Sequence, residues 1–288
     1  FMIKKFNYFF QACLIYLLFI IGRIIGIKIS RKIFSFLFTF IGPIFKSKKI
    51  IKSNINIFSK DINDYERNKI INNMWKNYGR ILSEYVFIKE FRDTLLKQNI
   101  IIEGQEILEN IKRNNQPVIF ISGHFNNFEL MAMHIDNSGV NLAAIYRPLN
   151  NIYLNKIMEK LRKKYICAKQ VKKGIAGTKL LLKYFKRGSS IALMIDQRVS
   201  QGLKSNFFKK EAYTTSIPAQ FVKKFKCKVV PIYIERTSND NFMLEIMKPI
   251  NFDNGKTIEN ITLELNQLLE KMIIRNPYQW IWSHNRWK

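Results

Sequence analysis

The pattern of hydrophobic positions separates an apolar N-terminal segment from a body of shorter apolar runs. Residues 6–27 contain a single charged residue, Arg23, and are about as long as a helix that crosses the hydrocarbon core of a bilayer. Residues 33–45 form a shorter apolar stretch with Gly42-Pro43 near its end, which predicts an interfacial or buried helix. Because Arg23 interrupts the apolar run, two core helices of a soluble protein remain the alternative for residues 6–45.

From about residue 115 onward, β-rich runs alternate with amphipathic segments. The runs predicted as strands are 117–122, 142–146, 190–195, 228–235 and 242–247. The segments predicted as helices are 126–136, 150–164, 178–186, 216–225 and 258–274, and residues 46–114 are mostly helical and polar. This alternation predicts an α/β fold with a mixed, mostly parallel central sheet flanked by helices. We therefore expect residues 1–45 to be a membrane anchor with an interfacial helix, and residues 46–288 to be one α/β domain.

Charge narrows the choice of partners. The chain has 48 Lys and Arg against 21 Asp and Glu, a formal net charge of +27. Such a balance favours nucleic acid, anionic membrane lipids, or an acidic protein or substrate, although a solvated basic surface without a specific ligand is the alternative. Lys28, Arg31 and Lys32 directly follow the candidate span, so the body is expected on the cytoplasmic side, and the lysines are expected near anionic headgroups.

The remaining composition excludes several classes of protein. Cys13, Cys167 and Cys227 lie far apart without a CxxC pair, so neither a zinc ribbon nor a disulfide framework is supported. His134 lies ten residues beyond His124, which is not metal-ligand spacing, and we expect neither a metal nor a cofactor. The sequence has no zinc finger, helix-turn-helix or aromatic RNA-binding strand pattern, so nucleic acid is not an expected partner.

Candidate chemistry is concentrated in residues 122–129, SGHFNNFE, where the first strong strand ends and a helix begins. The carboxyl ends of strands are the usual ligand sites of such sheets. If Asn126 is the N-cap, His124 lies in the preceding loop and Glu129 in the first turn, so their side chains can meet. A carboxylate that holds one imidazole nitrogen leaves the other free to accept a proton. A capping box between Asn126 and Glu129, and a helix-start histidine without chemistry, are the alternatives.

Further motifs follow this segment in a fixed order. They are Tyr146-Arg147-Pro148, Arg162 within residues 161–164, Asp196-Gln197, Phe207-Phe208 with Ala212-Tyr-Thr214-Thr215, Val229-Val230-Pro231, and the ending Tyr278-Gln-Trp-Ile-Trp-Ser-His284-Asn-Arg286-Trp-Lys288. Together with His124-x4-Glu129, over residues 5–288, they resemble the late acyltransferases of lipid A biosynthesis, within the glycerolipid-type acyltransferases. Arg198 and Lys209 depart from the family pattern, which bears on substrate choice more than on the reaction type.

The resemblance implies an O-acyltransferase that needs no cofactor. Its donor would be an acyl carrier protein thioester, and its acceptor a hydroxyl of a Kdo-bearing lipid A precursor. The enzyme would sit in the inner membrane by a single span, with its catalytic domain on the cytoplasmic side. Anionic membrane lipids would be further partners.

The residues make chemical sense of such a reaction. His124 would remove the proton of the acceptor hydroxyl and Glu129 would orient it, while backbone N–H groups near Asn126 would bind the oxyanion. Arginines match the geometry of carboxylates and phosphates, so Arg147 or Arg162 would bind the acidic sugar or phosphate headgroup. Asp196 would order one of these arginines, or be a strand-end turn residue. The predicted catalytic residues are therefore His124 and Glu129, and the predicted substrate-binding residues are Arg147, Arg162, Asp196 and Asn126.

Two other kinds of function remain open at this point. The same reaction could serve another lysophospholipid or glycolipid acceptor. A different class would be a basic, membrane-associated nucleic-acid-binding protein, or a silent membrane adaptor that keeps the fold. The intact pair of His124 and Glu129 argues against the silent adaptor.

Overall fold

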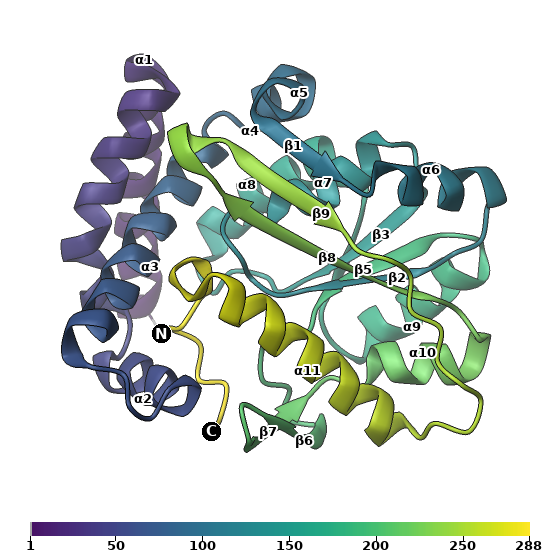
Figure 1. Cartoon of the computed structure of the whole chain (residues 1–288). Helices are drawn as coiled ribbons and strands as arrows, with labels where there is room; N and C mark the ends of the chain where they lie inside the picture. The colour runs from purple at the N-terminus through teal and green to yellow at the C-terminus, as the bar shows by residue number, and fades with distance from the viewer. Residues whose placement is uncertain (1) are drawn as a thin grey trace.

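The computed structural model describes residues 2–288, apart from the side chains of residues 2–4, 45, 96 and 97; Phe1, the first residue of the predicted anchor, lies outside the described residues. A seven-stranded sheet has the order β1-β9-β8-β2-β5-β3-β4, and β6 and β7 form a separate hairpin (Figure 1). The strands are β1 Ile100–Glu103, β2 Ile119–Ser122, β3 Leu142–Tyr146, β4 Lys169–Lys172, β5 Ser190–Met194, β6 Leu203–Phe207, β7 Lys210–Thr214, β8 Val229–Arg236 and β9 Phe242–Ile246.

Strand pairing confirms the predicted mixed, mostly parallel sheet. Within the seven-stranded sheet, β8 and β9 pair antiparallel and the other described pairs are parallel. The central strand β2 is buried along its whole length, which explains its continuous apolar sequence, since a parallel strand covered on both faces has no polar side.

Helices cover both faces of this sheet, with α6, α7 and α8 above it and α9, α10 and α11 below it in Figure 1. The helices are α1 Met2–Phe45, α2 Lys48–Phe58, α3 Asp64–Tyr85, α4 Ile88–Glu90, α5 Leu96–Asn99, α6 Gln105–Asn114, α7 Glu129–Asn137, α8 Ile152–Leu161, α9 Ile175–Lys186, α10 Ile217–Phe225 and α11 Ile258–Arg275. Short π-helical turns lie at Phe91–Leu95 and Arg162–Ile166, and 3₁₀ turns at Ser238–Asp240 and Pro277–Gln279.

The five predicted strands are confirmed as β2, β3, β5, β8 and β9, with ends shifted by one or two residues. The sequence patterns did not reveal β1, β4, β6 and β7. The first two are the edges of the large sheet, and β4, with the sequence KQVK, buries only Val171. Edge strands lack a neighbour on one side and tolerate polar residues, so their sequences carry a weak hydrophobic signal.

Helix α1 joins the two predicted apolar segments into one element with a kink. Gly26 has a φ of +78° and a ψ of +165°, a conformation that favours glycine, and the helix resumes on the other side of it. The Ser30 hydroxyl donates to the carbonyls of Gly22 and Gly26, at 2.8 and 2.7 Å, and so satisfies groups near the kink. The second half of α1 then packs closely against α3, where a Cβ at Gly79 would lie 2.1 Å from the carbonyl oxygen of Phe34.

Within the described residues, α1 contains one stretch long and apolar enough to cross a membrane, Lys5–Ile44, and the mean hydropathy of its most apolar 18 residues is 2.2. Only 11% of its most hydropathic window is buried. Phe10, Leu14 and Leu17 are more than half exposed and lie on one face of the helix. Such exposure of large apolar side chains disfavours the alternative that residues 6–45 are core helices of a soluble protein.

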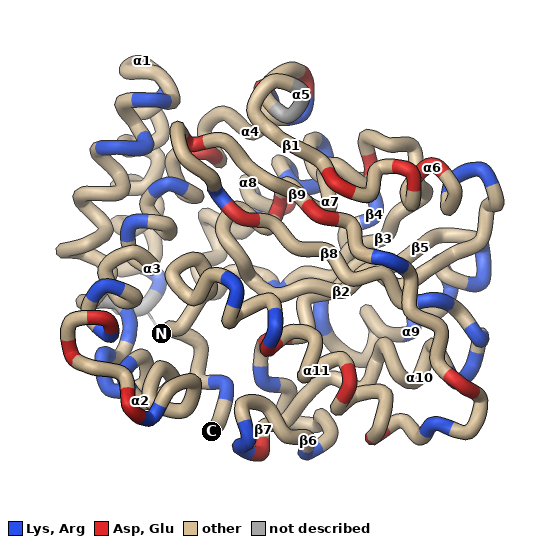
Figure 2. The backbone as a smooth tube through the Cα atoms, viewed as in Figure 1, with Lys and Arg blue, Asp and Glu red and all other residues tan. Residues whose placement is uncertain are grey.

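The basic residues of α1 do not all face outward. Figure 2 shows Lys and Arg along α1 with no Asp or Glu on the same helix, and both signs of charge mixed over the body. Lys28 and Lys32 are exposed, as expected for contacts with headgroups. Arg31 is instead 7% exposed and binds Glu84 with an Nε–Oε1 distance of 2.7 Å. Arg31 therefore faces the protein interior, where the buried carboxylate of Glu84 requires a charged partner.

We expect this exposed apolar face to hold the chain at membranes. The intact protein should remain in the membrane fraction after carbonate and high-salt extraction, because its contact with lipid is apolar. Replacing Phe10, Leu14 and Leu17 with serine should shift it toward the soluble fraction, since each buried methylene contributes about 0.8 kcal/mol. Ile175→Ser is the matched control, because Ile175 is 73% exposed on the body of the protein. Release of the unmodified chain by carbonate would contradict this expectation.

Candidate active site

Parallel pairing brings two predicted site residues together. Ser122 of β2 lies opposite Met194 of β5. His124 and Asp196 each follow two residues later, so they leave the sheet at the same edge and the same level. The carboxyl ends of these strands therefore form the site, as expected for an open α/β sheet.

The neighbouring strands deliver positive charge to the same edge. Tyr146 of β3 lies opposite Lys172 of β4, and the next residues along the chain are Arg147 and Lys173. Arg147 is exposed. Burial lowers the pKa of Lys173, and the charge of Arg147 lowers it further. Two cations thus lie close enough to repel one another, an arrangement that an anionic ligand would relieve.

A cavity of about 740 Å³ lies over this edge, and this volume is typical of small-molecule sites. Its polar lining residues include His124, Glu129, Arg147, Arg162, Lys173, Gln197 and His284. Apolar walls come from Phe128, Ala132, Ile145, Ile166 and Ile217, among others. Asp196 and Asn126 are not among its lining residues and are buried, 3% and 1% exposed.

The carboxylate of Asp196 holds the His124 ring and the loop that carries it. Its Oδ1 lies 2.7 Å from Nδ1 of His124. Its Oδ2 accepts hydrogen bonds from the backbone N–H of His124 and from Nε1 of Trp280, at 2.7 and 2.8 Å. Burial raises the pKa of Asp196, but the interactions with His124 outweigh burial and lower it to about 2. The ionised carboxylate fixes the proton of His124 on Nδ1.

The other ring nitrogen of His124 lies at the cavity. Its Nε2 is 3.3 Å from the amide nitrogen of Gln197, which donates to it. The ring packs edge-on against Phe128, with 4.7 Å between ring centroids. This arrangement leaves an unprotonated nitrogen in position to accept a proton from a ligand that displaces the Gln197 amide.

The predicted contact between His124 and Glu129 is wrong. Oε1 of Glu129 instead accepts from Nε and Nη2 of Arg162, at 2.8 and 2.5 Å, and from the hydroxyl of Tyr85. Burial lowers the pKa of Arg162, but the charge of Glu129 outweighs burial and raises it. The carboxylate that contacts the His124 ring is that of Asp196, because strand register brings it to His124. Arg162 is accordingly paired within the protein, whereas Asp196 does not order an arginine as predicted.

Asn126 is neither an N-cap nor part of a capping box. It has a φ of +39°, and α7 begins three residues later than predicted, at Glu129. The backbone N–H of Asn126 donates to the carbonyl of Gln279 at 2.9 Å, and that of Asn127 donates to Oδ1 of Asn126 at 2.7 Å. Both N–H groups are therefore occupied, and the expectation that they bind an oxyanion is wrong.

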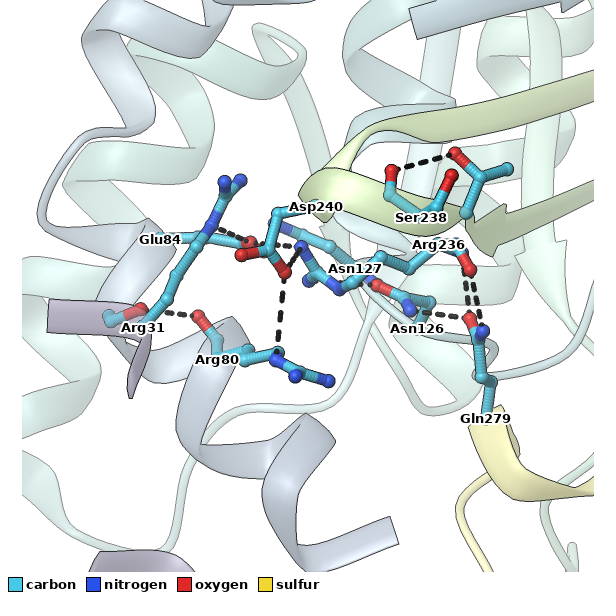
Figure 3. A network of polar contacts seen from close by, with 11 residues as sticks. Arg31, Arg80, Glu84, Asn126, Asn127, Arg236, Ser238, Asp240 and Gln279 are labelled. Carbon is cyan, nitrogen blue, oxygen red and sulfur yellow. Dashed lines mark hydrogen bonds and ion pairs between the residues drawn. The ribbon is translucent and has the colours of Figure 1, made fainter. Parts of the chain in front are cut away.

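A buried charge network supports this loop from below (Figure 3). Glu84 of α3 is fully buried and binds Arg31 of α1 and Arg236 of β8, each with a nitrogen–oxygen distance of 2.7 Å. The amide of Asn127 donates to the second oxygen of Glu84 at 2.8 Å. The guanidinium of Arg236 also donates to Oδ1 of Asn126 at 3.1 Å. The histidine loop is thus tied to the first helix through one carboxylate.

Several residues of the site were not predicted. Tyr85, Glu84 and Arg236 lie outside any motif, because their contacts join segments that are distant in the sequence. Gln279, Trp280 and His284 belong to the C-terminal motif, whose regular spacing of aromatic and basic residues was the available signal.

Comparisons with known proteins agree with the sequence motifs. A family model for "Bacterial lipid A biosynthesis acyltransferase" matches residues 3–288. The lipid A biosynthesis acyltransferase 2 of Shigella flexneri is 21% identical over 244 residues, which cover 82% of this chain and 76% of that protein. The lipid A biosynthesis palmitoleoyltransferase of Escherichia coli K12 is 23% identical over 277 residues, with coverages of 91% and 87%.

A solved structure is also similar to this chain. It is the 1-acyl-sn-glycerophosphate (LPA) acyltransferase PlsC from Thermotoga maritima, with 15% sequence identity and a TM-score of 0.43. The similarity covers 88% of this chain and 99% of that one.

The Glu129–Arg162 pair should be coupled in stability. Their side chains are 8% and 11% exposed, so Glu129→Ala leaves a buried guanidinium without its partner and should cost about 3–5 kcal/mol in the free energy of unfolding. Glu129→Ala with Arg162→Met removes both charges and should cost much less than the sum of the single changes. Denaturant unfolding of the detergent-solubilised protein measures the cycle. Additive losses would show that the pair is not coupled.

Proposed function

The chain belongs to the bacterial lipid A biosynthesis acyltransferase family, whose model spans residues 3–288, and we propose that it transfers a fatty acyl chain from an acyl carrier protein thioester to a hydroxyl of a Kdo-bearing lipid A precursor. The observation that carries this proposal is the 2.7 Å pair of His124 and Asp196 at the floor of the cavity. A histidine held on one side by a carboxylate is the general base that such a transfer requires.

The reaction begins when the acceptor hydroxyl takes the place of the Gln197 amide at Nε2 of His124. As the hydroxyl oxygen attacks the thioester carbonyl carbon, Nε2 accepts its proton and a carbon–oxygen bond forms. The ionised carboxylate of Asp196 stabilises the resulting imidazolium. When the tetrahedral intermediate collapses, the carbon–sulfur bond breaks and His124 returns the proton to the leaving thiolate. The products are an ester on the acceptor and the free thiol of the carrier.

The anionic headgroup of the acceptor is bound by Arg147 and Lys173. This assignment is supported by the pKa of Lys173, which burial lowers and the charge of Arg147 lowers further, and by the exposure of Arg147 at the cavity. Arg162 also lines the cavity, but its guanidinium already donates hydrogen bonds to Glu129 and to the hydroxyl oxygen of Tyr85. Its predicted part in headgroup binding is therefore less favoured than that of Arg147. The predicted catalytic role of Glu129 stays a prediction, and its contacts make it a partner of Arg162.

Residues 1–45 anchor the enzyme in the inner membrane by a single span, and residues 46–288 form the catalytic domain on the cytoplasmic side. The exposed apolar face of α1 and the exposed cations Lys28 and Lys32 beside it support this placement, because they suit the acyl region and the anionic headgroups of one leaflet. The net charge of +27 favours docking of an acidic carrier protein.

His124 should be required for turnover and not for folding. His124→Ala should lower kcat for acyl transfer by roughly 10²–10⁴, the usual contribution of a general base. The protein should still fold, but its thermal midpoint should fall, because the buried Asp196 carboxylate loses the hydrogen bond from the ring. The assay supplies an acyl carrier protein thioester and a Kdo-bearing lipid A precursor to the protein in detergent or vesicles. A variant with full activity would end the proposal. Transfer by the unmodified enzyme only to a lysophospholipid would keep the chemistry and replace the acceptor.

Arginine-to-lysine changes should separate the two candidate headgroup residues. Arg147→Lys should raise the acceptor KM while hydrolysis of the donor by water is unaffected, because lysine replaces a bidentate guanidinium poorly. Arg162→Lys should instead lower the thermal midpoint, because its guanidinium binds Glu129 with two nitrogens. If neither change alters the acceptor KM, an anionic headgroup is not recognised by these arginines.

A further inference from the structure

None of the residues assigned so far stabilises the oxyanion that forms during the proposed acyl transfer. Attack on a thioester carbonyl places negative charge on the carbonyl oxygen, and enzymes stabilise that oxyanion with fixed hydrogen-bond donors. The backbone N–H groups of Asn126 and Asn127, the expected donors, are both used within the protein. The donors that remain at the cavity include the backbone N–H groups of Phe128 and Glu129 at the start of α7 and the side chain of His284.

The C-terminal segment brings a second histidine to this wall. A β-bridge between Phe125 and Trp280 joins the segment to the loop of His124. His284 follows, lines the cavity, and has a carbonyl that accepts from the amide of Asn54 at 2.7 Å. The ring is fixed as well, because its Nε2 accepts the backbone N–H of Arg198 at 3.0 Å.

This hydrogen bond determines where the proton of His284 lies. A backbone N–H can only donate, so Nε2 is unprotonated and the neutral ring carries its hydrogen on Nδ1. Among the hydrogen bonds between described residues, none involves Nδ1 of His284. Gln197 precedes Arg198 directly and touches Nε2 of His124, so one dipeptide contacts both histidines. Nδ1–H of His284 is thus a free donor near the general base.

The surroundings keep this donor neutral. Burial lowers the pKa of His284 to about 4, the ionised Asp196 opposes that change, and His124, Lys173 and Arg147 add to it. The ring therefore stays uncharged at the pH at which His124 must act as a base. A neutral donor with a fixed hydrogen suits an oxyanion that forms and disappears within one turnover, because it exchanges no proton with it.

We propose that His284 is the oxyanion donor of this active site, with its Nδ1–H hydrogen-bonded to the carbonyl oxygen of the acyl group during transfer. The proposal rests on the acyl-transfer function proposed above. The other side-chain donors named at the cavity have other partners: the Gln197 amide lies against His124, Arg162 is held by Glu129, and Arg147 and Lys173 are assigned to the headgroup. No covalent bond to His284 forms or breaks, and its hydrogen remains on Nδ1 throughout.

Two isosteric variants separate the donor from the structural hydrogen bond. An asparagine amide reaches about the place of Nδ1, and a glutamine amide reaches about that of Nε2. His284→Gln can keep an acceptor for the N–H of Arg198 but lacks the Nδ1 donor, whereas His284→Asn keeps the donor. We expect His284→Gln to lower kcat by roughly 10²–10³, the usual effect of losing one oxyanion donor, and His284→Asn to stay within about tenfold of the unmodified enzyme.

A second readout identifies the step that His284 serves. The same oxyanion forms when water replaces the lipid acceptor, so His284→Gln should lower transfer and hydrolysis of the acyl carrier protein thioester by the same factor. The acceptor KM should not change. The shape of the kcat–pH profile between about pH 6 and 9 should also be unchanged, because a group with a low pKa does not titrate there.

Three outcomes would overturn the proposal. They are equal activity of His284→Gln and the unmodified enzyme, a raised acceptor KM with unchanged hydrolysis, and a displaced acid limb of the pH profile. If both variants fail to fold, ¹⁵N-histidine spectra of the unmodified protein show which ring nitrogen of His284 carries the proton. A proton on Nε2 would contradict the proposal. An unmodified enzyme without transfer activity refutes the proposed function instead. An active enzyme that needs His124 but not Nδ1 of His284 refutes only this inference.

Discussion

The parallel register of β2 and β5 is the constraint on which the site depends. Because Ser122 lies opposite Met194, residues two positions further on in each loop emerge side by side. One of them is an imidazole and the other a carboxylate with almost no exposure to solvent. The pair needs no sequence proximity, since 72 residues separate its members. That register determines which way the imidazole ring points. It also determines that Nε2 is the unprotonated nitrogen and that this nitrogen lies at the cavity.

A buried carboxylate keeps this arrangement rigid. Glu84 forms ion pairs with Arg31 and Arg236 and accepts a hydrogen bond from the Asn127 amide. Helices α1 and α3, strand β8 and the histidine loop therefore all meet at the carboxylate of Glu84. Removing such a charge from water is costly, and the cost is recovered only if every partner is in place. The network therefore links the seating of the first helix on the body to the position of the loop that carries His124. The enzyme's membrane helix is, in this respect, part of the support of its active site.

Local sequence pattern was sufficient for the central part of the fold. The apolar run before Ser122 and the polar residues after it correctly placed His124 at the end of a buried strand. The local sequence pattern could not predict contacts between residues that are distant in the sequence. Glu129 was the nearest carboxylate along the chain, but the positive φ of Asn126 delays the helix and directs Glu129 to Arg162. Asp196 was found as a strand-end residue, but its partner depends on register, which one sequence does not contain. The sequence did not reveal the kink at Gly26 for a similar reason. One kinked helix and two separate helices would both produce the two apolar segments.

The central claim is that Asp196, not Glu129, sets the proton position of His124. The most direct test is the kcat of Asp196→Asn, measured across pH with an acyl carrier protein thioester and the lipid acceptor. An asparagine amide facing Nδ1 favours the tautomer with its proton on Nε2, which cannot accept a proton from the acceptor. The account predicts a loss of roughly 10³–10⁴ in kcat at neutral pH with the protein still folded. Full turnover by folded Asp196→Asn would contradict it.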